Sequence, residues 1–417
     1  MGDPVTFSSG KVYLMQPVFF AAPHRVMFLA GATQALLAVL WWSGVLASRI
    51  APDAIPAALT AAGGFPPSWA HGSLMIFGLY PFFIFGFLMT AMPRWQGAEP
   101  VPPRVYVPAF VLMSAGWISF YAGFWLPLFA GPGLAMVLLG WLIGVVDLIR
   151  VSRHPNPDRR HASAVVCALV LGALGLGGLL GYLLGTEQAA ARAALTVGIW
   201  WFLLPVFVTV SHRMIPFFSS SVLPGYVTYR PYWVLYLLLA ALFAHGLLAL
   251  MDLRQWLWLL DLPAAGVALY LSVRWQFRRS FAVRLLAMLH VAFAWLGVAL
   301  SLFAIQGLAE FAGRPMLGLA PVHALAIGFF GSMLIGMVSR VTLGHSGRAL
   351  AADRLTWLVF LGVQVVALMR VVGEMVAGAW TNLVALAAAC VWLLVFGAWF
   401  IKFAPAYWRP RIDRHPG

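Results

Sequence analysis

The chain has 417 residues, of which 63% are hydrophobic and 9% are charged, whereas a typical soluble domain carries about 25% charged residues. This composition excludes a water-soluble globular fold. The formal net charge of +14 does not indicate a nucleic-acid partner, because the arginines fall in short segments between apolar runs. Cys167 and Cys390 lie far apart inside apolar runs, so they form no zinc or covalent-haem motif.

About twelve apolar runs are each long enough to cross a lipid bilayer. Backbone amides in hydrocarbon must be hydrogen-bonded within their own segment, and no barrel-like alternation is present, so these runs predict α-helices. We therefore expect an all-α polytopic membrane bundle, as a single transmembrane domain over 1–417 with short tails at 1–24 and 403–417. In chain order the predicted helices cover 25–47, 69–92, 105–125, 127–149, 162–185, 193–218, 231–250, 256–275, 283–306, 320–342, 355–374 and 380–402.

The charged loops predict the orientation of the bundle. If the N-terminus is cytoplasmic, nearly all lysines and arginines fall on the inner side, as the positive-inside rule requires. Both termini are then cytoplasmic. No cleavable signal sequence is visible, because the first apolar run is full-length and lacks a small-residue cleavage site. The exceptions are Arg370, inside a helix, and the outer-loop residues Arg49, Arg192, Arg254 and Arg314.

Histidines gather at two depths of the predicted helices. His71 and His323 each open a helix at the outer face, and His245 lies in the same half. Ionisable groups in a membrane are functional candidates, and neutral imidazole is a common ligand of haem iron and copper. A lone histidine at a helix end is more often an interfacial residue. Four histidines lie toward the cytoplasm: His24, His212, His290 and His345. Three are interpreted as solvated loop or tail residues: His154, His161 and His415.

A bis-histidine haem requires one histidine from each of two facing helices at similar depth, and His71 and His323 meet the depth condition. Downstream of His323, Gly328, Ser332 and Gly336 recur every four residues. Such small residues make room either for a flat macrocycle or, more commonly, for a packed helix.

Carboxylates are scarce in the predicted helices, where only Asp147, Asp261 and Glu374 occur. This scarcity argues against proton-coupled transport, which usually relies on carboxylates deep in the bundle. Glu374 follows Arg370 by four residues on one helix face. The arginine is therefore either self-neutralised by this pair or available to an anion such as a haem propionate.

Three segments carry a resemblance to a known family. They run over 71–97, 213–218 and 323–348, and they include Arg-Met-Ile-Pro-Phe-Phe and Leu-Gly-His-Ser-Gly-Arg. With His290 and Trp295, these segments resemble the NnrS family in the right order along nearly the whole chain. The family often reads His-x-His-Glu at the start of its second helix, where this chain has Ser73 and Leu74 in place of the second histidine and the glutamate.

The resemblance implies a bacterial inner-membrane protein that contains haem and copper and is tied to nitric-oxide metabolism, denitrification and resistance to nitrosative stress. The expected haem is b-type and non-covalent, and the expected ligand is nitric oxide or a metal–nitrosyl species. His71, His323 and His345 match family histidines, and Arg213, Arg340 and Arg348 match family arginines. We predict His71 and His323 as haem ligands. We also predict Arg340, Arg348 and Arg370 as cofactor-binding residues, with stabilisation of the adjacent loop as the alternative role of Arg340 and Arg348. His24, His212, His290 and His345 are predicted as copper or second-metal ligands.

Three functions remain open from the sequence. The favoured one is binding of nitric oxide and protection, although a nitric-oxide-linked oxidoreductase is not excluded; no electron-entry domain or clear proton path is visible. The second is a permease for a small anion or metal, with arginines and helix-end histidines as selectivity groups. The third is an accessory or assembly subunit that associates with respiratory-chain proteins in the lipid bilayer.

Overall fold

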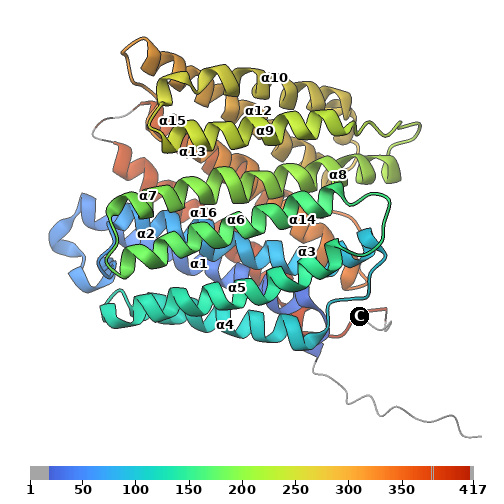
Figure 1. Ribbon diagram of the computed structural model, residues 1–417, viewed down its shortest axis with the longest axis horizontal. Coiled ribbons are helices and arrows are strands. Elements are labelled where there is room, and N and C mark those ends of the chain that lie inside the picture. Colours follow the sequence, from blue (N-terminus) through green and yellow to red (C-terminus); the bar gives the residue numbers. More distant parts are fainter. Residues whose placement is uncertain (1–17, 377, 379, 414–417) are drawn as a thin grey trace, which may run out of the picture.

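The structure is a computed structural model that describes residues 18–376, 378 and 380–413 (Figure 1). It is 81% helical and contains no strand among these residues, which confirms the predicted all-α class. Lys11, Arg414 and His415 lie outside the described residues.

Eleven helices in the described part of the chain are long and apolar enough to cross a membrane. Three of them are composite, because a π-helical segment interrupts the α-helix. These three are α2–η4–α3 (Pro67–Ser73, Leu74–Leu79, Tyr80–Gln96), α7–η6–α8 (Gln188–Val197, Gly198–Leu203, Leu204–Val222) and α13–η8–α14 (Ala320–His323, Ala324–Gly331, Ser332–His345). The other eight are built on α1 (Pro23–Ile50), α4 (Pro103–Ala122), α5 (Ala130–Ser152), α6 (Arg160–Leu183), α9 (Tyr232–Leu250), α12 (Arg284–Phe311), α15 (Arg354–Met375) and α16 (Thr381–Phe403).

The predicted helix at 256–275 is α10, Trp258–Arg274, which has 17 residues and is shorter than the eleven others. About 17 residues is the lower end of what spans a bilayer. Since α10 packs along α12 (Figure 1), it completes the predicted set of about twelve helices.

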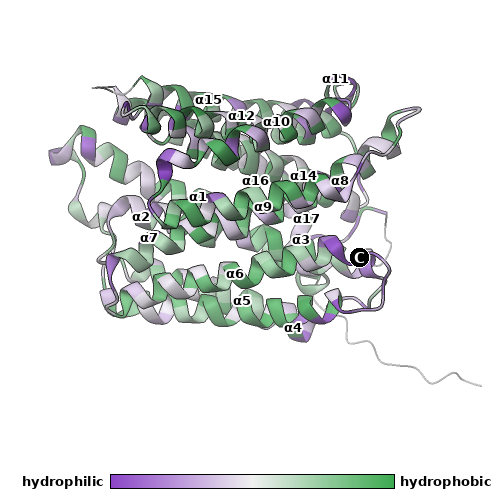
Figure 2. Ribbon diagram, turned by 45° about the horizontal axis from the view of Figure 1, so that its top comes forward, coloured by the Kyte–Doolittle hydropathy of each residue, from purple (hydrophilic) through white to green (hydrophobic). Residues whose placement is uncertain are grey.

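The surface of the bundle matches a bilayer rather than water. Apolar residues run along the helices, and polar residues concentrate at the two ends of the bundle (Figure 2). Large apolar side chains such as Leu174 and Leu394 are 66% and 74% exposed on the outside. The start of α1 and the C-terminal end lie at the same end (Figure 1), as an even number of crossings requires. The chain is therefore a multi-pass membrane protein.

The short helices α2, α7 and α13 lie at the opposite end, on the left in Figure 1, which is the outer end in the predicted orientation. Each of them leads directly into one of the π-helical segments η4, η6 and η8. Single π-helical turns are rare and occur frequently at functional sites. Tyr80 links two of these composite helices, because its hydroxyl donates a 2.6 Å hydrogen bond to the carbonyl of Ala326 in η8.

The small residues of the 323–345 helix pack against neighbouring helices. A Cβ on Gly328 would lie 2.4 Å from the Trp295 ring of α12, and one on Gly336 would lie 3.0 Å from Leu289. Ser332 accepts a 2.7 Å hydrogen bond from Gln364 of α15. Helix packing, rather than room for a macrocycle, therefore explains this repeat.

Candidate functional site

A cavity of about 440 Å³ lies in the outer half of the bundle, within the range of about 300–1,000 Å³ that is typical of cofactor pockets. His71 of α2, His323 of α13 and Arg370 of α15 all line it. Two histidines that are distant in sequence thus share one cavity. The three π-helical segments contribute to its wall through Ile76, Ile199 and Ala326, and most other lining residues are apolar or aromatic, including Trp42, Ala388 and Trp392.

The ring of His323 is held by its own helix and by Arg370. Its Nδ1 lies 3.0 Å from the carbonyl of Leu319, and its Nε2 lies 3.3 Å from Nη2 of Arg370. A carbonyl accepts and a guanidinium donates, so these partners assign the proton to Nδ1 and the lone pair to Nε2. Metal-binding histidines typically donate their second ring nitrogen to a backbone carbonyl in this way.

His71 stacks on a tryptophan and keeps a free nitrogen. Its ring lies 4.4 Å from that of Trp42, at an interplanar angle of 12°, and its buried Nδ1 has no hydrogen-bond partner. An unsatisfied buried polar atom costs about 1–3 kcal/mol. The guanidinium of Arg49 lies 4.9 Å over the same Trp42 ring and adds positive charge near the outer rim.

Arg370 forms the expected pair with Glu374, at 2.5 Å between Nη2 and Oε1. The pair does not use the whole guanidinium, because the buried Nη1 has no partner. Arg370 is thus paired with Glu374, as the spacing predicted, and one of its nitrogens is buried without a partner.

These features fit a non-covalent bis-histidine haem. Two histidines of separate helices, α2 and α13, line the cavity with their imidazoles, and the largely apolar wall suits a macrocycle. The free Nη1 of Arg370 and the nearby Arg49 suit anionic substituents. Neither Trp42 nor Arg49 was predicted as a site residue. Their seven-residue spacing, which places them on one face of α1, is the sequence pattern that indicates them.

A second histidine pair lies at the inner end. The ring centroids of His24 in α1 and His345 at the end of α14 are 4.5 Å apart. Among the described residues, the only hydrogen-bond partner of either ring is the hydroxyl of Thr90, at 3.5 Å from Nδ1 of His24. The two imidazoles can therefore act as metal ligands. The positive charges of Arg25, Arg94 and Arg411 act on this pair and disfavour additional positive charge there.

The four predicted inner ligands do not converge. His212 donates from Nε2 to the carbonyl of Pro231 at 3.2 Å and accepts from His161 Nε2 at 3.0 Å. His290 lies elsewhere, with Nε2 3.1 Å from the hydroxyl of Ser219. Across residues 18–376, 378 and 380–413, no group of three or more His, Cys, Asp or Glu side chains is placed to hold a metal ion. Of the four predicted inner ligands, the structure therefore brings together His24 and His345 and leaves His212 and His290 apart from them.

The interpretation of His161 as a solvated loop residue is wrong. It is the second residue of α6 and only 1% exposed, because the helix begins earlier than the predicted 162. Its Nδ1 is buried without a partner. His154, by contrast, is exposed as expected, and its Nδ1 lies 3.1 Å from the carbonyl of Gln96.

Arg340 and Arg348 do not belong to the outer cavity. Arg340 follows His323 by 17 residues along one spanning helix, which corresponds to about 25 Å. Its guanidinium instead lies 4.0 Å over the ring of Phe218. Arg348 follows the inner end of α14, so neither residue can contact a group bound by His71 and His323.

A buried histidine–carboxyl hydrogen bond joins α9 to α10. Nδ1 of His245 lies 2.7 Å from Oδ1 of Asp261, and both residues are 2% exposed. The His245 ring stacks on Trp200 of η6, with 3.2 Å between centroids. The sequence showed both residues in the membrane but not that they are partners, because they lie on different helices.

The fold and the sites define a class of protein: a polytopic helical membrane protein with histidine pairs toward both ends of the bundle. The chain belongs to the NnrS family, since the family model described as NnrS protein matches residues 18–411, nearly the whole chain. A search of curated proteins finds no match. Family membership supports a membrane protein of the nitric-oxide response, as the resemblance implied.

Proposed function

We propose that the protein binds haem and copper in the bacterial inner membrane, binds nitric oxide there and protects the cell against nitrosative stress. The observation that carries this proposal is that His71 and His323 line one cavity together with Arg370, whose Nη1 has no hydrogen-bond partner. The cavity combines two imidazoles, a guanidinium with one unpartnered nitrogen and a largely apolar wall. This combination best suits a macrocycle that has a metal at its centre and carboxylates at its edge.

Each residue has a separate task in this proposal. His71 and His323 would supply imidazole nitrogens, and Leu319 orients the His323 ring through its carbonyl. The nitrogen of His323 is Nε2, which would exchange its 3.3 Å contact with Arg370 for the iron. Arg370 and Arg49 compensate negative charge at the outer rim. When bound, haem supplies an iron centre that binds nitric oxide tightly in its ferrous state, and the polarity of the protein wall decides between storage and reduction of the gas. The apolar lining excludes water from the cavity and admits a neutral gas from the bilayer.

Binding is favoured over turnover. Reduction of nitric oxide needs protons, and a membrane relay uses chains of carboxylates. In the described part of the chain three carboxylates of the long helices are engaged, Asp147 with Arg150, Asp261 with His245 and Glu374 with Arg370, and Glu310 lies in the last turn of α12. They leave no continuous acidic path toward the cavity.

We assign copper to His24 and His345. Both lie in or at the end of spanning helices, and their rings are adjacent. Two imidazoles suit monovalent copper, and the surrounding arginines favour an anionic additional ligand over a second cation.

A small-anion permease is the second candidate, and the positive charge of Arg25, Arg94 and Arg411 near the inner histidines favours it. The middle of the bundle opposes it, because an anion would cross a wholly apolar region between Phe83, Phe207 and Met337. Uptake of nitrite or nitrate into proteoliposomes by metal-free protein would support this candidate.

The deciding experiment is purification in mild detergent, followed by a reduced-minus-oxidised visible spectrum, metal analysis and a nitric-oxide titration. We expect haem bands that shift with nitric oxide, and their loss or conversion to a five-coordinate form in His71→Ala and His323→Ala. His154→Ala is the matched control, because this histidine is exposed at the inner surface. A folded wild-type protein without colour or metal would refute the proposal. Stable co-purification with respiratory-chain proteins and no cofactor would favour an accessory subunit.

A further inference from the structure

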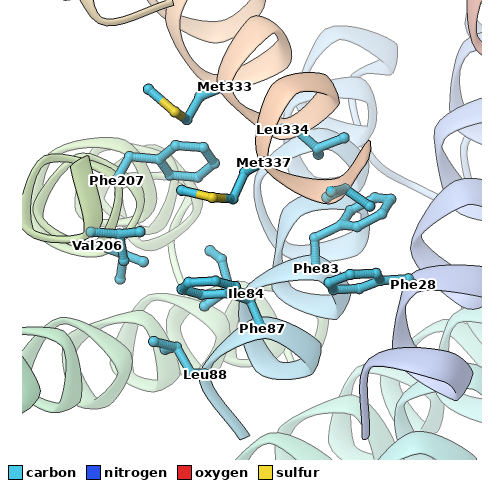
Figure 3. Close-up of a pocket in the computed structure, with 12 residues that line it drawn as sticks. Phe28, Phe83, Ile84, Phe87, Leu88, Val206, Phe207, Met333, Leu334 and Met337 are labelled. Atoms are coloured by element: carbon cyan, nitrogen blue, oxygen red, sulfur yellow. The ribbon is translucent and has the colours of Figure 1, made fainter. Parts of the chain in front are cut away.

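A second, smaller cavity of about 50 Å³ lies in the centre of the bundle (Figure 3). It is bounded by α1, α3, α8 and α14. Every residue on its wall is apolar, and the side chains in Figure 3 present only carbon and the two sulfur atoms of Met333 and Met337. The proposed function uses no part of this cavity.

The cavity lies between the two histidine pairs. Leu334 on its wall is 11 residues from His323 and 11 residues from His345 along the same spanning helix, or about 16 Å from each. On the inner side, the wall residue Phe28 has its ring centroid 5.9 Å from that of His24. The cavity is therefore adjacent to the proposed copper pair.

On the outer side, a layer of three aromatic rings separates the two cavities. Phe207 lines the central cavity, whereas Tyr80 and Phe330 line the outer one. The ring centroids are 4.7 Å apart for Phe207 and Phe330, and 5.7 Å apart for Tyr80 with either phenylalanine. The Tyr80 hydroxyl is anchored on Ala326, but the two phenylalanines are held by packing alone. These two rings are therefore the part of the layer that no hydrogen bond fixes.

The chemistry of the wall selects the occupant. The cavity exceeds the roughly 30 Å³ that one water occupies in the liquid, but a water there would find none of the 2–4 polar partners it needs. Apolar cavities of this kind stay dry and bind small apolar molecules such as xenon. A charged ion is excluded by the same wall.

We propose that the central cavity is a binding and transfer site for a small neutral diatomic gas, which it passes between the outer cavity and the His24–His345 pair. The identity of that gas as nitric oxide rests on the proposed function, whereas the apolar site itself does not. Filling the cavity removes the site and leaves both histidine pairs intact.

The first test is a crystal of the full-length protein under xenon pressure. We expect an anomalous xenon peak among Phe83, Phe207 and Met337, and loss of the peak in Val210→Phe, which fills the cavity from α8. Val338→Ile fills it less and keeps the test valid if the larger side chain prevents folding. Val365→Phe, on the lipid-facing side of α15 and 47% exposed in the wild type, is the matched control and should keep the peak. A wild-type crystal without xenon in the cavity overturns the inference whether or not haem is present.

The second test is recombination of carbon monoxide after flash photolysis of the haem-loaded protein. A dissociated molecule that enters the central cavity returns late, so Val210→Phe and Val338→Ile should raise the fraction that rebinds at once. Added xenon should have the same effect in wild type but not in Val210→Phe. Unchanged rebinding in a protein that binds xenon refutes the transfer role. Absence of haem, by contrast, defeats the proposed function and leaves the xenon test to decide on the cavity.

Discussion

The Arg370→Gln variant tests whether Arg370 only forms an ion pair with Glu374 or also contacts the proposed haem. In the wild type, Nη2 of Arg370 contacts both Glu374 and His323, while Nη1 is buried without a partner. Removing the charge has two consequences. It leaves Glu374, whose side chain is 15% exposed, without its partner, and it removes the donor available to an anionic group of the haem.

The two consequences have different magnitudes. A hydrogen bond to a charged group contributes about 1.5–3 kcal/mol, so loss of the haem contact weakens binding about 10- to 150-fold. Leaving a buried charge unpaired destabilises by up to about 3–5 kcal/mol, an upper limit here because Glu374 is not fully buried. Arg370→Gln should therefore both lower the unfolding temperature of the haem-free protein and weaken haem binding.

The double variant Arg370→Gln/Glu374→Gln is the matched control, because it removes the pair without an orphaned charge. Haem titration followed by absorbance and thermal unfolding of the haem-free protein measure the two effects separately. We expect the double variant to recover stability but not haem affinity. Recovery of both, or wild-type haem affinity in Arg370→Gln, would show that Arg370 serves only to neutralise Glu374 and would refute the cofactor contact.

Three further predictions concern other parts of the molecule. His345→Ala should lower the copper content measured by metal analysis while leaving the haem spectrum unchanged. Gly328→Ala should lower stability by about 1–3 kcal/mol in thermal unfolding, because the new Cβ would lie 2.4 Å from the Trp295 ring. Asp353→Ala should cost about 0.5–2 kcal/mol at pH 7, because Asp353 caps α15 by accepting from the Thr356 amide at 2.9 Å. Burial raises the pKa of Asp353, but hydrogen bonds from Lys402 and Thr356 outweigh it and hold the pKa at about 2, below its usual 3.8. The difference between variant and wild type should therefore be full above about pH 5 and shrink as the pH falls toward 2.

Each of these predictions has a control. His154→Ala should keep the copper, and an unchanged copper content in His345→Ala would contradict the inner metal pair. Gly266→Ala on α10 should be neutral or stabilising, since nothing lies within 4 Å of the new Cβ. For Asp353, Asn retains the cap without the charge, so Asp353→Asn should keep more stability at pH 7 than Asp353→Ala. A stability difference that stays constant down to pH 2 would show that the carboxylate charge is irrelevant.

The sequence by itself determined the features that depend on local pattern. Apolar length and backbone hydrogen bonding require a bundle of membrane-spanning helices, and the spacing of Arg370 and Glu374 brings them together on one helix face. The common depth of His71 and His323 was also readable, because depth follows residue count along a helix. The same arithmetic separates Arg340 from the outer histidines, so that error was avoidable from the sequence.

Only the tertiary structure decided which side chains meet across helices. Hydropathy sets how deep a residue lies but not which way its helix is rotated or which helix is its neighbour. For this reason the sequence could not show that His71 and His323 share a cavity, that His161 is buried against His212, or that His24 meets His345 while His290 does not. The two cavities are likewise spaces between helices. They arise where π-helical segments and aromatic rings of different helices pack together, so no single segment of the sequence predicts them.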